Sequence, residues 1–396
     1  MLRNIFTISI SLMLLTALKL EAKDSLSHVS ASNVAGGQKE TADSTVMKKN
    51  LFQKIKAYFD ESNVVKEEKT FDVSFIGGPH FSSDTKLGLG LVASGLYRVD
   101  KEDKTISPSN ISLYGDVTTR GFYVIGIRSN TIFPREDYRI DLITFFASQP
   151  TEYWGIGYQN GKYGASTKYT INEIYLKLDL LKKIIPNTYI GFIGEFVNRN
   201  ADKFGNPDCL LGEERVSSYG GGGLSLSYDT RDFIPNPYDG IYAKLEYIIY
   251  PHFIGNRNTI TKTEASFRAY KQVWKGGVLA YELQGIFQGG TVPWNMLVLS
   301  GGSRMMRGYY EGRYRDRMMV GTQVELRQHV WRRNGIVVWA GAGNLFNDFS
   351  DFHFKETLPT VGFGYRWEFK NRVNVRLDYG FGRGESAFYF NINEAF

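Results

Sequence analysis

Alternating strand-like segments constrain the fold of this chain more than any other feature of its sequence. In the segment 318–330, Val324 and Leu326 fall on one face, and Glu325 and Arg327 fall on the other. Side chains of a β-strand point to opposite faces with a period of two, so this segment has an apolar face and a charged face. A soluble sandwich and a membrane barrel both produce such a pattern, and other features must decide between them.

Segments of this kind recur to the end of the chain, most of them near or above the ~9–11 residues that cross a bilayer at a tilt. One of them, 358–369, should place Phe363, Trp367 and Phe369 on its apolar face. The sequence predicts about sixteen strands, an even number as in bacterial barrels, near 70–77, 86–98, 109–119, 122–133, 137–149, 167–180, 188–199, 219–229, 241–250, 259–273, 278–288, 318–330, 336–344, 358–369, 372–380 and 386–395.

The connections between these segments differ in length according to their order. Tight turns such as Lys275–Gly277 and Arg332–Gly335 follow even-numbered segments. Long connections follow odd-numbered ones: Pro150–Ser166, Asn200–Ser218, Gly289–Arg317 and Leu345–Thr357. Outer-membrane barrels have short periplasmic turns and long extracellular loops, whereas a sandwich gives no reason to sort its loops. We therefore predict an all-β fold, an antiparallel barrel over residues 70–396 that spans the outer membrane of a diderm bacterium.

Composition excludes several other classes. The mean hydropathy is −0.27, and no apolar run beyond the N-terminus approaches the ~20 residues of a membrane helix. The net charge of +6 is modest and dispersed, which argues against a nucleic-acid partner. Cys209 is the single cysteine, so no disulfide forms within one chain.

The first part of the chain indicates export. Residues 1–22 have a positive start, an apolar core and a small-residue cleavage site, which is typical of a signal peptide. We expect residues 23–69 to form a periplasmic linker that is disordered over 23–46. Within it, residues 48–60 have the spacing of a short amphipathic helix. This helix could lie on the membrane surface or enter the barrel mouth; alternatively, it only leads into the barrel.

One long loop carries an unusual concentration of charge. Residues 299–317 contain five arginines, four glycines and three tyrosines. Such a loop needs acidic partners if it is to be ordered, and the polar interior of a barrel could supply them. Among inward charges we expect Glu325, Arg327, Arg366, Glu368, Arg376 and Asp378 to form a paired network.

Three segments together resemble the BamA/TamA family of outer-membrane assembly proteins, the bacterial surface antigen family. They are Gly222–Tyr247, with a periplasmic turn motif of Asp229, Arg231 and Asp232; the loop 301–316 with the strand VGTQVELR; and the C-terminal pair VRLDYG and FYFNINEAF. The resemblance implies a sixteen-stranded barrel whose Arg307 loop folds into the lumen. The resemblance covers roughly residues 71–396. The family's periplasmic POTRA repeats have no counterpart in the sequence, so we expect a barrel-only form.

The resemblance also implies a loop latch made by Arg307, Gly308 and Tyr309. In the family the arginine meets an acid on the strand after the next turn, where this chain has Gly341. We therefore expect Arg307 to pair with another inward carboxylate, with Glu325 as the first choice and Asp378 as the second.

The barrel seam, where the first strand meets the last, is the second predicted site. We expect a short first strand, ended by Gly77 and Gly78, in which Val73 lies opposite Phe390. Phe396 should close the last strand as an aromatic residue at the membrane interface. A weakly paired seam leaves backbone groups that a client strand could occupy.

The leading functional hypothesis is a non-enzymatic barrel that assists insertion or translocation of outer-membrane or surface proteins. Its partners would be outer-membrane lipid, client β-barrel proteins and periplasmic or outer-membrane assembly proteins. A passive channel or structural barrel is the first alternative, and a surface-loop binding protein is the second. The five histidines lie beside no specific nucleophile or carboxylate pair, and we expect no catalytic residue, cofactor or metal.

Overall fold

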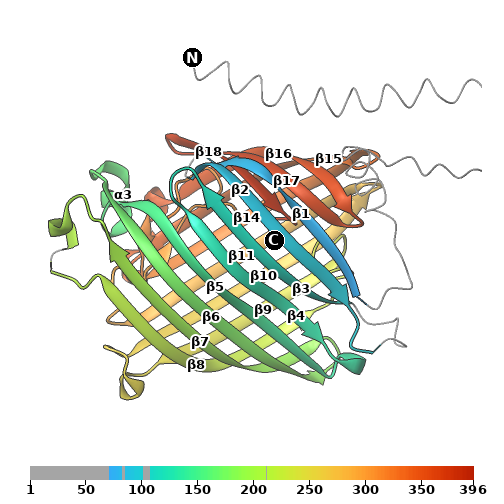
Figure 1. The fold of residues 1–396 in the computed structure, drawn as a ribbon, viewed down its shortest axis with the longest axis horizontal. Coiled ribbons are helices and arrows are strands. Elements are labelled where there is room, and N and C mark those ends of the chain that lie inside the picture. Colours follow the sequence, from blue (N-terminus) through green and yellow to red (C-terminus); the bar gives the residue numbers. More distant parts are fainter. Residues whose placement is uncertain (1–70, 83–84, 101–107, 211) are drawn as a thin grey trace, which may run out of the picture. The chain divides into compact units, whose positions relative to one another are not determined.

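A computed structural model describes residues 71–82, 85–100, 108–210 and 212–396. The signal peptide, the linker and the 48–60 helix predicted from the sequence lie outside these residues. The described chain forms one sixteen-stranded antiparallel sheet and a small two-stranded one (Figure 1). No helix in these described ranges is both long and apolar enough to cross a membrane.

The strands run as follows: β1 Phe71–Ser82, β2 Lys86–Tyr97, β3 Ser109–Thr118, β4 Tyr123–Ile132, β5 Tyr138–Tyr153, β6 Thr167–Ile185, β7 Thr188–Asp202, β8 Val216–Asp229, β9 Gly240–Tyr250, β10 Ile260–Trp274, β11 Gly277–Gly290, β12 Val298–Leu299, β13 Arg315–Asp316, β14 Met318–Trp331, β15 Asn334–Phe346, β16 Leu358–Lys370, β17 Val373–Gly382 and β18 Glu385–Ile392. The helix α3 spans Gly157–Tyr163, and 3-10 turns span Pro134–Glu136, Pro207–Leu210, His252–Ile254, Phe349–Asp351 and Phe354–Glu356.

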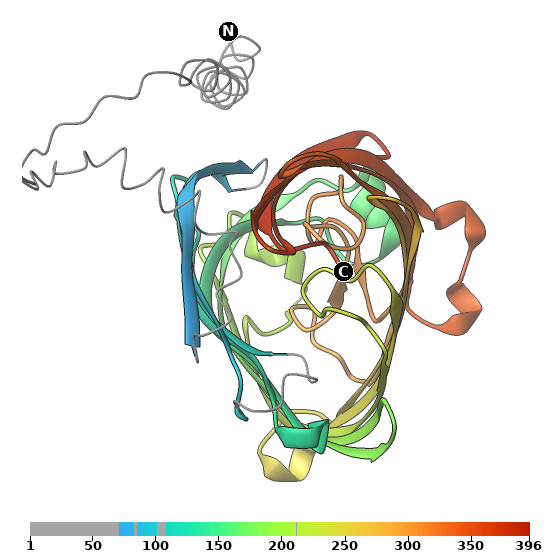
Figure 2. The same cartoon turned by 90° about the vertical axis from the view of Figure 1, so that its right-hand side faces the viewer.

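Each spanning strand pairs with its neighbours in the sequence, so the sheet order runs from β1 to β18 and skips only β12 and β13. The sheet curls into a barrel in which the edge strands β1 and β18 lie against each other (Figure 2). The predicted fold class is confirmed, and every predicted strand overlaps an observed one.

Polar side chains point into the barrel and apolar side chains point away from it. Leu89 on β2 is 59% exposed, although it lies in a regular strand. Lys244 pairs with Asp179 at 2.7 Å, and Lys262 pairs with Glu195 at 2.6 Å, across the inner faces of strands β6 to β10. This inverted arrangement is what a bilayer requires, because lipid solvates the outer face while the inner charges pair with one another.

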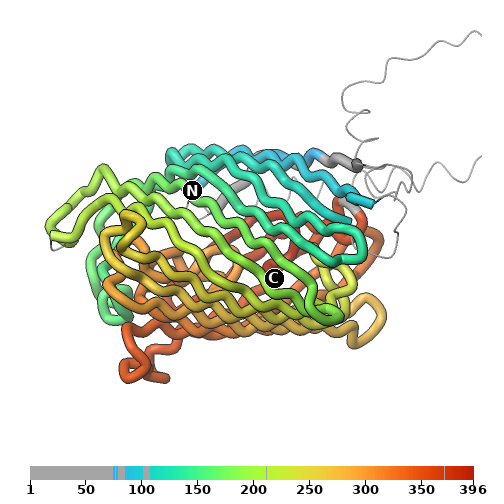
Figure 3. The backbone as a smooth tube through the Cα atoms, turned by 90° about the horizontal axis from the view of Figure 1, so that it is seen from below, coloured from blue at the N-terminus to red at the C-terminus, as the bar shows by residue number. Residues whose placement is uncertain are grey.

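Long connections, those after β5, β7, β11 and β15, all lie at one end of the barrel, which we call the long-loop end. The loops after β5, β7 and β15 extend beyond the strands there (Figure 3). The opposite, short-turn end has two-residue connections at 275–276, 332–333 and 371–372. The sorting is incomplete. The connection 230–239 at the short-turn end is long, and 383–384 at the long-loop end is short.

The first strand differs from the prediction. It continues through Gly77 and Gly78, which pair with Leu91 and Gly90 of β2, and ends only at Ser82. His80, expected in a loop, therefore lies in β1. A glycine weakens a strand but keeps its backbone donor and acceptor, so the ladder of hydrogen bonds can pass through it.

The ends of two C-terminal strands also differ from the prediction. A β-bulge between Glu368 and Lys370 reverses the alternation of β16, so Phe369, expected outward, is 0% exposed. The last strand ends at Ile392, because Asn393 adopts a left-handed backbone with φ of 67°. Asparagine tolerates that conformation better than most residues, and it turns the end of the chain away from the strand direction.

Candidate functional site: the lumenal latch

The loop 291–317 joins β11 to β14 and folds back inside the ring of strands (Figure 2). At its innermost part Arg307 is 0% exposed. Its Nη1 donates to Oδ2 of Asp378 at 2.8 Å, and its Nη2 donates to Glu325 and to Oε1 of Gln323 at 3.1 Å. Both carboxylates that the sequence offered as alternatives thus hold the same guanidinium.

The two carboxylates belong to a larger network of buried charges on β14, β16 and β17. Asp378 accepts from Arg366 at 2.6 Å and lies 3.3 Å from Arg376, while Glu325 pairs with Arg327 at 2.9 Å. Hydrogen bonds to charged groups contribute ~1.5–3 kcal/mol each, and unpairing a buried charge costs more than that. Asp378 is the centre of the network, since three arginines converge on it.

The resemblance implies an acidic residue on β15, where this chain has Gly341. Instead of an acid, an aromatic ring of β15 contacts the latch. Trp339 of β15 lies under Arg307, with the guanidinium carbon 3.8 Å from a ring centroid. A cation over an indole face is favourable, more so where water is excluded. Gly341, two residues further along, could not carry a side chain here without a shift, because a Cβ would lie 2.6 Å from the Thr322 carbonyl oxygen.

The backbone of the latch sits directly on the backbone of β17. A Cβ on Gly380 would lie 2.7 Å from the carbonyl carbon of Arg307 and 2.8 Å from the nitrogen of Gly308. Gly308 has φ of 112°, and a Cβ there would lie 2.6 Å from the carbonyl carbon of Phe381. Glycine at both positions is therefore what allows this close approach.

Polar contacts also fix the latch to β16 and β18. The nitrogen of Gly308 donates to the Tyr389 hydroxyl of β18 at 3.0 Å, and Thr360 of β16 donates to the carbonyl of Arg307. The hydroxyl of Tyr309 donates to the Pro359 carbonyl at 2.7 Å. Burial raises the pKa of Tyr309 to about 12, so its phenol stays protonated and keeps this donor.

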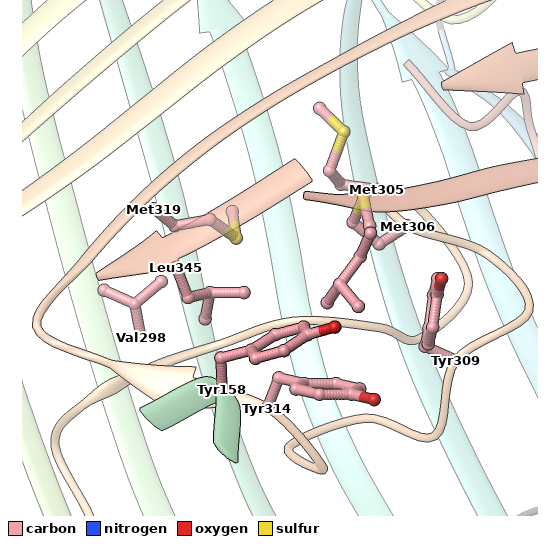
Figure 4. Packing of buried hydrophobic residues seen from close by; sticks show 9 residues of the cluster. Tyr158, Val298, Met305, Met306, Tyr309, Tyr314, Met319 and Leu345 are labelled. Atoms are coloured by element: carbon pink, nitrogen blue, oxygen red, sulfur yellow. The ribbon is translucent and has the colours of Figure 1, made fainter. Parts of the chain in front are cut away.

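Outside the charge network, the loop has an apolar core of its own. Met305 and Met306 pack with aromatic side chains of the loop and of α3 (Figure 4). The whole cluster contains Tyr158, Val298, Met305, Met306, Tyr309, Tyr314, Met319, Leu345 and Leu358. Arg313 reinforces it through Glu385 of β18 and the carbonyl of Gly161. The loop is therefore packed and paired along its length rather than suspended in the lumen.

The last residues of the chain enter the same network, which corrects the expected place of Phe396. Instead of lying at the membrane interface, Phe396 is buried inside the barrel, its ring centroid 6.2 Å from that of Tyr270. Glu394 accepts from Arg366 at 2.8 Å and from Asn374 at 2.7 Å. The other predicted seam residues lie in the edge strands. Val73 of β1 pairs with Gly95 of β2, and Phe390 of β18 pairs with Leu377 of β17.

The turn motif after β8 occupies the short-turn end of the barrel. Asp229 accepts from Arg231 at 2.9 Å and from Arg139 at 3.1 Å. Asp232 pairs at 2.8 Å with Arg372, in the distant turn between β16 and β17. Arg372 also donates to the carbonyl of Asn236. The connection 230–239 is thus tied to a part of the wall several strands away.

We expect Arg372→Ala to release this connection. Amide hydrogen exchange should then rise over 232–238, while β8 and β9 keep their protection, because one side chain supplies both contacts across the barrel mouth. Lys271→Ala is the matched control, since it removes only the exposed pair with Asp239. Equal exchange in both variants would show that Arg372 does not hold the turn.

Several members of the site escaped the sequence reasoning. Gln323 lies on the charged face of its strand, which alternation identifies, but nothing in the sequence aims it at Arg307. Trp339 lies in a segment without polar residues on either face up to Gly343, so alternation does not show that it points inward. The inward glycines Gly380 and Gly382 alternate along β17, which is the signal that could have indicated a close approach. The sequence pattern places Glu394 in the last strand and gives no sign of the inward turn that follows Ile392.

His329 is exposed at the end of β14 and contacts the carbonyl of Arg332. Within the residues that the structure describes, no group of three or more His, Cys, Asp or Glu side chains could hold a metal ion.

Known proteins share this architecture. The Omp85 superfamily domain model matches residues 109–396. BamA from Haemophilus ducreyi lacking POTRA domains 1–3 is 12% identical with a TM-score of 0.54, and the alignment covers 82% of this chain and 70% of that one. CdiB from Acinetobacter baumannii is 12% identical with a TM-score of 0.50, and coverage is 82% and 60%.

CdiB from Escherichia coli is similar to the same degree, at 10% identity, a TM-score of 0.50, and coverage of 82% and 61%. The chain therefore spans about 60% of the length of the CdiB proteins. At such identities the structural likeness establishes a shared fold. No curated protein matches the sequence.

Proposed function

Because this chain belongs to the Omp85 superfamily, we propose that it is an integral barrel of the bacterial outer membrane that assists insertion or translocation of outer-membrane or surface proteins. The apolar outer face and the paired inner charges support the location. The BamA-like barrel, which the family and structural matches bear out, supports the role. Client β-barrel proteins and periplasmic or outer-membrane assembly proteins would be its partners.

The observation that carries the proposal is the mismatch between the two edge strands. β1 has 12 residues, whereas β18 has 8 and then turns inward. An antiparallel partner of that length can pair with only part of β1. Backbone donors and acceptors along the rest of β1 would be available to an added strand, which is how extended segments bind sheet edges.

The latch would control this seam from inside the barrel. It rests on β17 and binds Tyr389 of β18, so it fixes the position of the edge strand. The inward C-terminal segment shares Arg366 with Asp378, the central carboxylate of the latch. We propose that the ordered latch keeps the seam in one register, and that a client strand first pairs where β18 leaves β1 uncovered and then displaces β18 from β1.

We expect a disulfide across the seam to abolish assembly activity while the barrel stays folded. Val73→Cys with Phe390→Cys, in a Cys209→Ser background, would join β1 to β18 and prevent their separation. The measurement is complementation of a deletion strain, read from the abundance of outer-membrane proteins before and after reduction. Reduction should restore activity.

A disulfide elsewhere in the wall serves as the control. Ser94→Cys with Ser112→Cys links β2 to β3 at paired positions whose hydroxyls already lie 2.9 Å apart, and it should leave activity intact. Full activity of the seam-linked protein would remove the seam from the mechanism. An unchanged outer-membrane proteome in the deletion strain, together with conductance in liposomes, would favour the passive channel instead.

A further inference from the structure

The connection between β15 and β16 lies outside the barrel wall, unlike the latch. Figure 2 shows this segment, in orange-red, beyond the ring of strands. We call residues 347–357 the aromatic flap; they form two 3-10 turns, Phe349–Asp351 and Phe354–Glu356. Neither the proposed assembly function nor the latch uses them.

Strand register shows which face of the wall the flap covers. Phe287 of β11 pairs with Met318 of β14, which pairs with Phe346 of β15, so these three side chains share one face. Along β11 that face continues with Leu283 and Leu279, which are exposed, whereas Glu282 points inward and is buried. The row of three therefore lies on the outward, apolar face at the long-loop end.

The flap packs onto that row. The ring centroid of Phe349 lies 5.5 Å from that of Phe287 and 5.9 Å from that of Phe346, and Phe352 lies 5.3 Å from Phe346. Met318 and Phe346 are buried as a result, although they point out of the barrel. The flap thus replaces one outward apolar surface with another that is further from the barrel axis.

A polar contact keeps the flap in place. Asn344, on the outward face of β15, donates to the carbonyl of His353 at 2.9 Å and to the hydroxyl of Thr357 at 3.1 Å. Despite this anchoring, Phe349 remains 66% exposed and Phe354 remains 84% exposed. Large apolar side chains held in a fixed conformation and left uncovered indicate a binding surface.

We propose that the aromatic flap is a membrane-interface anchor, in which Phe349 and Phe354 insert among lipid chains beside the headgroups at the long-loop rim. The exposed rings continue the outward apolar belt of β11 and β15 without interruption. Transmembrane barrels place girdles of aromatic residues at this depth. The flap carries three acidic residues and one lysine, so lipid phosphate does not attract it and the contact is apolar. The inference rests on the proposed membrane location.

The test measures the depth of residue 354 in a bilayer. Phe354→Cys in a Cys209→Ser background would carry a nitroxide label, and the folded barrel would be reconstituted in phosphatidylcholine vesicles. Residue 354 suits a probe because its side chain is 84% exposed and its ring packs against Phe352, so labelling should not disturb the fold. Collision rates with oxygen, which concentrates in lipid, are compared with those of a nickel chelate, which stays in water.

Two further labelled variants make the outcome unambiguous. Leu283→Cys reports the lipid-facing wall, and Asp208→Cys reports an exposed loop. We expect oxygen collisions to outnumber nickel collisions at 354 and 283, and the reverse at 208. If the label at residue 354 collides mainly with nickel while the label at residue 283 collides mainly with oxygen, the anchor is overturned but the membrane location of the barrel still holds. A label at 354 shielded from both reagents would place it against protein, either this barrel or a second copy, and would also overturn the anchor. Nickel-accessible 283 would refute the membrane location itself.

Discussion

Asp378→Asn should release the latch loop and lower the thermal stability of the folded barrel. Three arginines converge on this carboxylate, and its neutralisation leaves Arg307, Arg366 and Arg376 facing one another around an amide. Breaking a buried ion pair from one side costs ~3–5 kcal/mol. Trypsin should then cut within 304–317 in proteoliposomes, and the heat-induced shift on gels should occur at a lower temperature.

The network predicts an order among related variants. Glu325→Gln should have a smaller effect, because Arg307 keeps its contact with Asp378. Adding Arg307→Met to Asp378→Asn should restore part of the lost stability, since it removes one of the uncompensated charges. Glu264→Gln is the control, because its carboxylate accepts from Gln284 on another part of the wall. Additive effects of Arg307→Met and Asp378→Asn would show that the two residues are not coupled.

Gly380→Val should expel the latch without altering any charge. The first added carbon would lie 2.7–2.8 Å from backbone atoms of Arg307 and Gly308, which cannot move aside as a flexible side chain could. Arg307 should then lose Asp378 and Glu325 together, although both carboxylates remain. Loop cleavage by trypsin should match or exceed that of Asp378→Asn, and the seam should become more permissive to pairing.

A second glycine separates this steric effect from a general cost of substitution. Gly194 lies in β7, and a Cβ there would have no heavy atom within 4 Å. Gly194→Val should therefore fold normally and protect the loop as the original chain does. Retained protection in Gly380→Val would mean that the latch backbone can be accommodated elsewhere, and that ionic contacts alone hold the loop.

Much of the barrel could be predicted because alternation and loop length are local properties of the sequence. The errors arose where the backbone departed from regular strand geometry. Gly77 and Gly78 suggested a strand end, but pairing with β2 continues through them. The left-handed Asn393 and the bulge at Glu368 are single-residue events that an alternating pattern does not reveal.

The latch was only partly predictable for a different reason. The family resemblance implies that the Arg307 loop enters the lumen, and strand alternation predicts Glu325 and Asp378 as inward carboxylates that can pair with it. The structure brings these three together. Trp339 and Gly380 contribute by shape and by the absence of a side chain, and both depend on how deeply the loop enters the barrel. That depth follows from tertiary packing, and the spacing of residues along the chain does not encode it.

The aromatic flap also affects how the barrel meets its neighbours in the plane of the membrane. With the flap inserted as proposed, the footprint of the protein in one leaflet widens along the wall from β11 to β15, where the flap packs on Phe287 and Phe346. Outward side chains of the wall from β2 to β5, such as Leu89 and Ile125, stay uncovered. A protein diffusing alongside can approach the second wall more closely than the first. Lateral encounters should therefore be biased toward the side that leads to β1, so that neighbouring molecules collect beside one edge of the sheet.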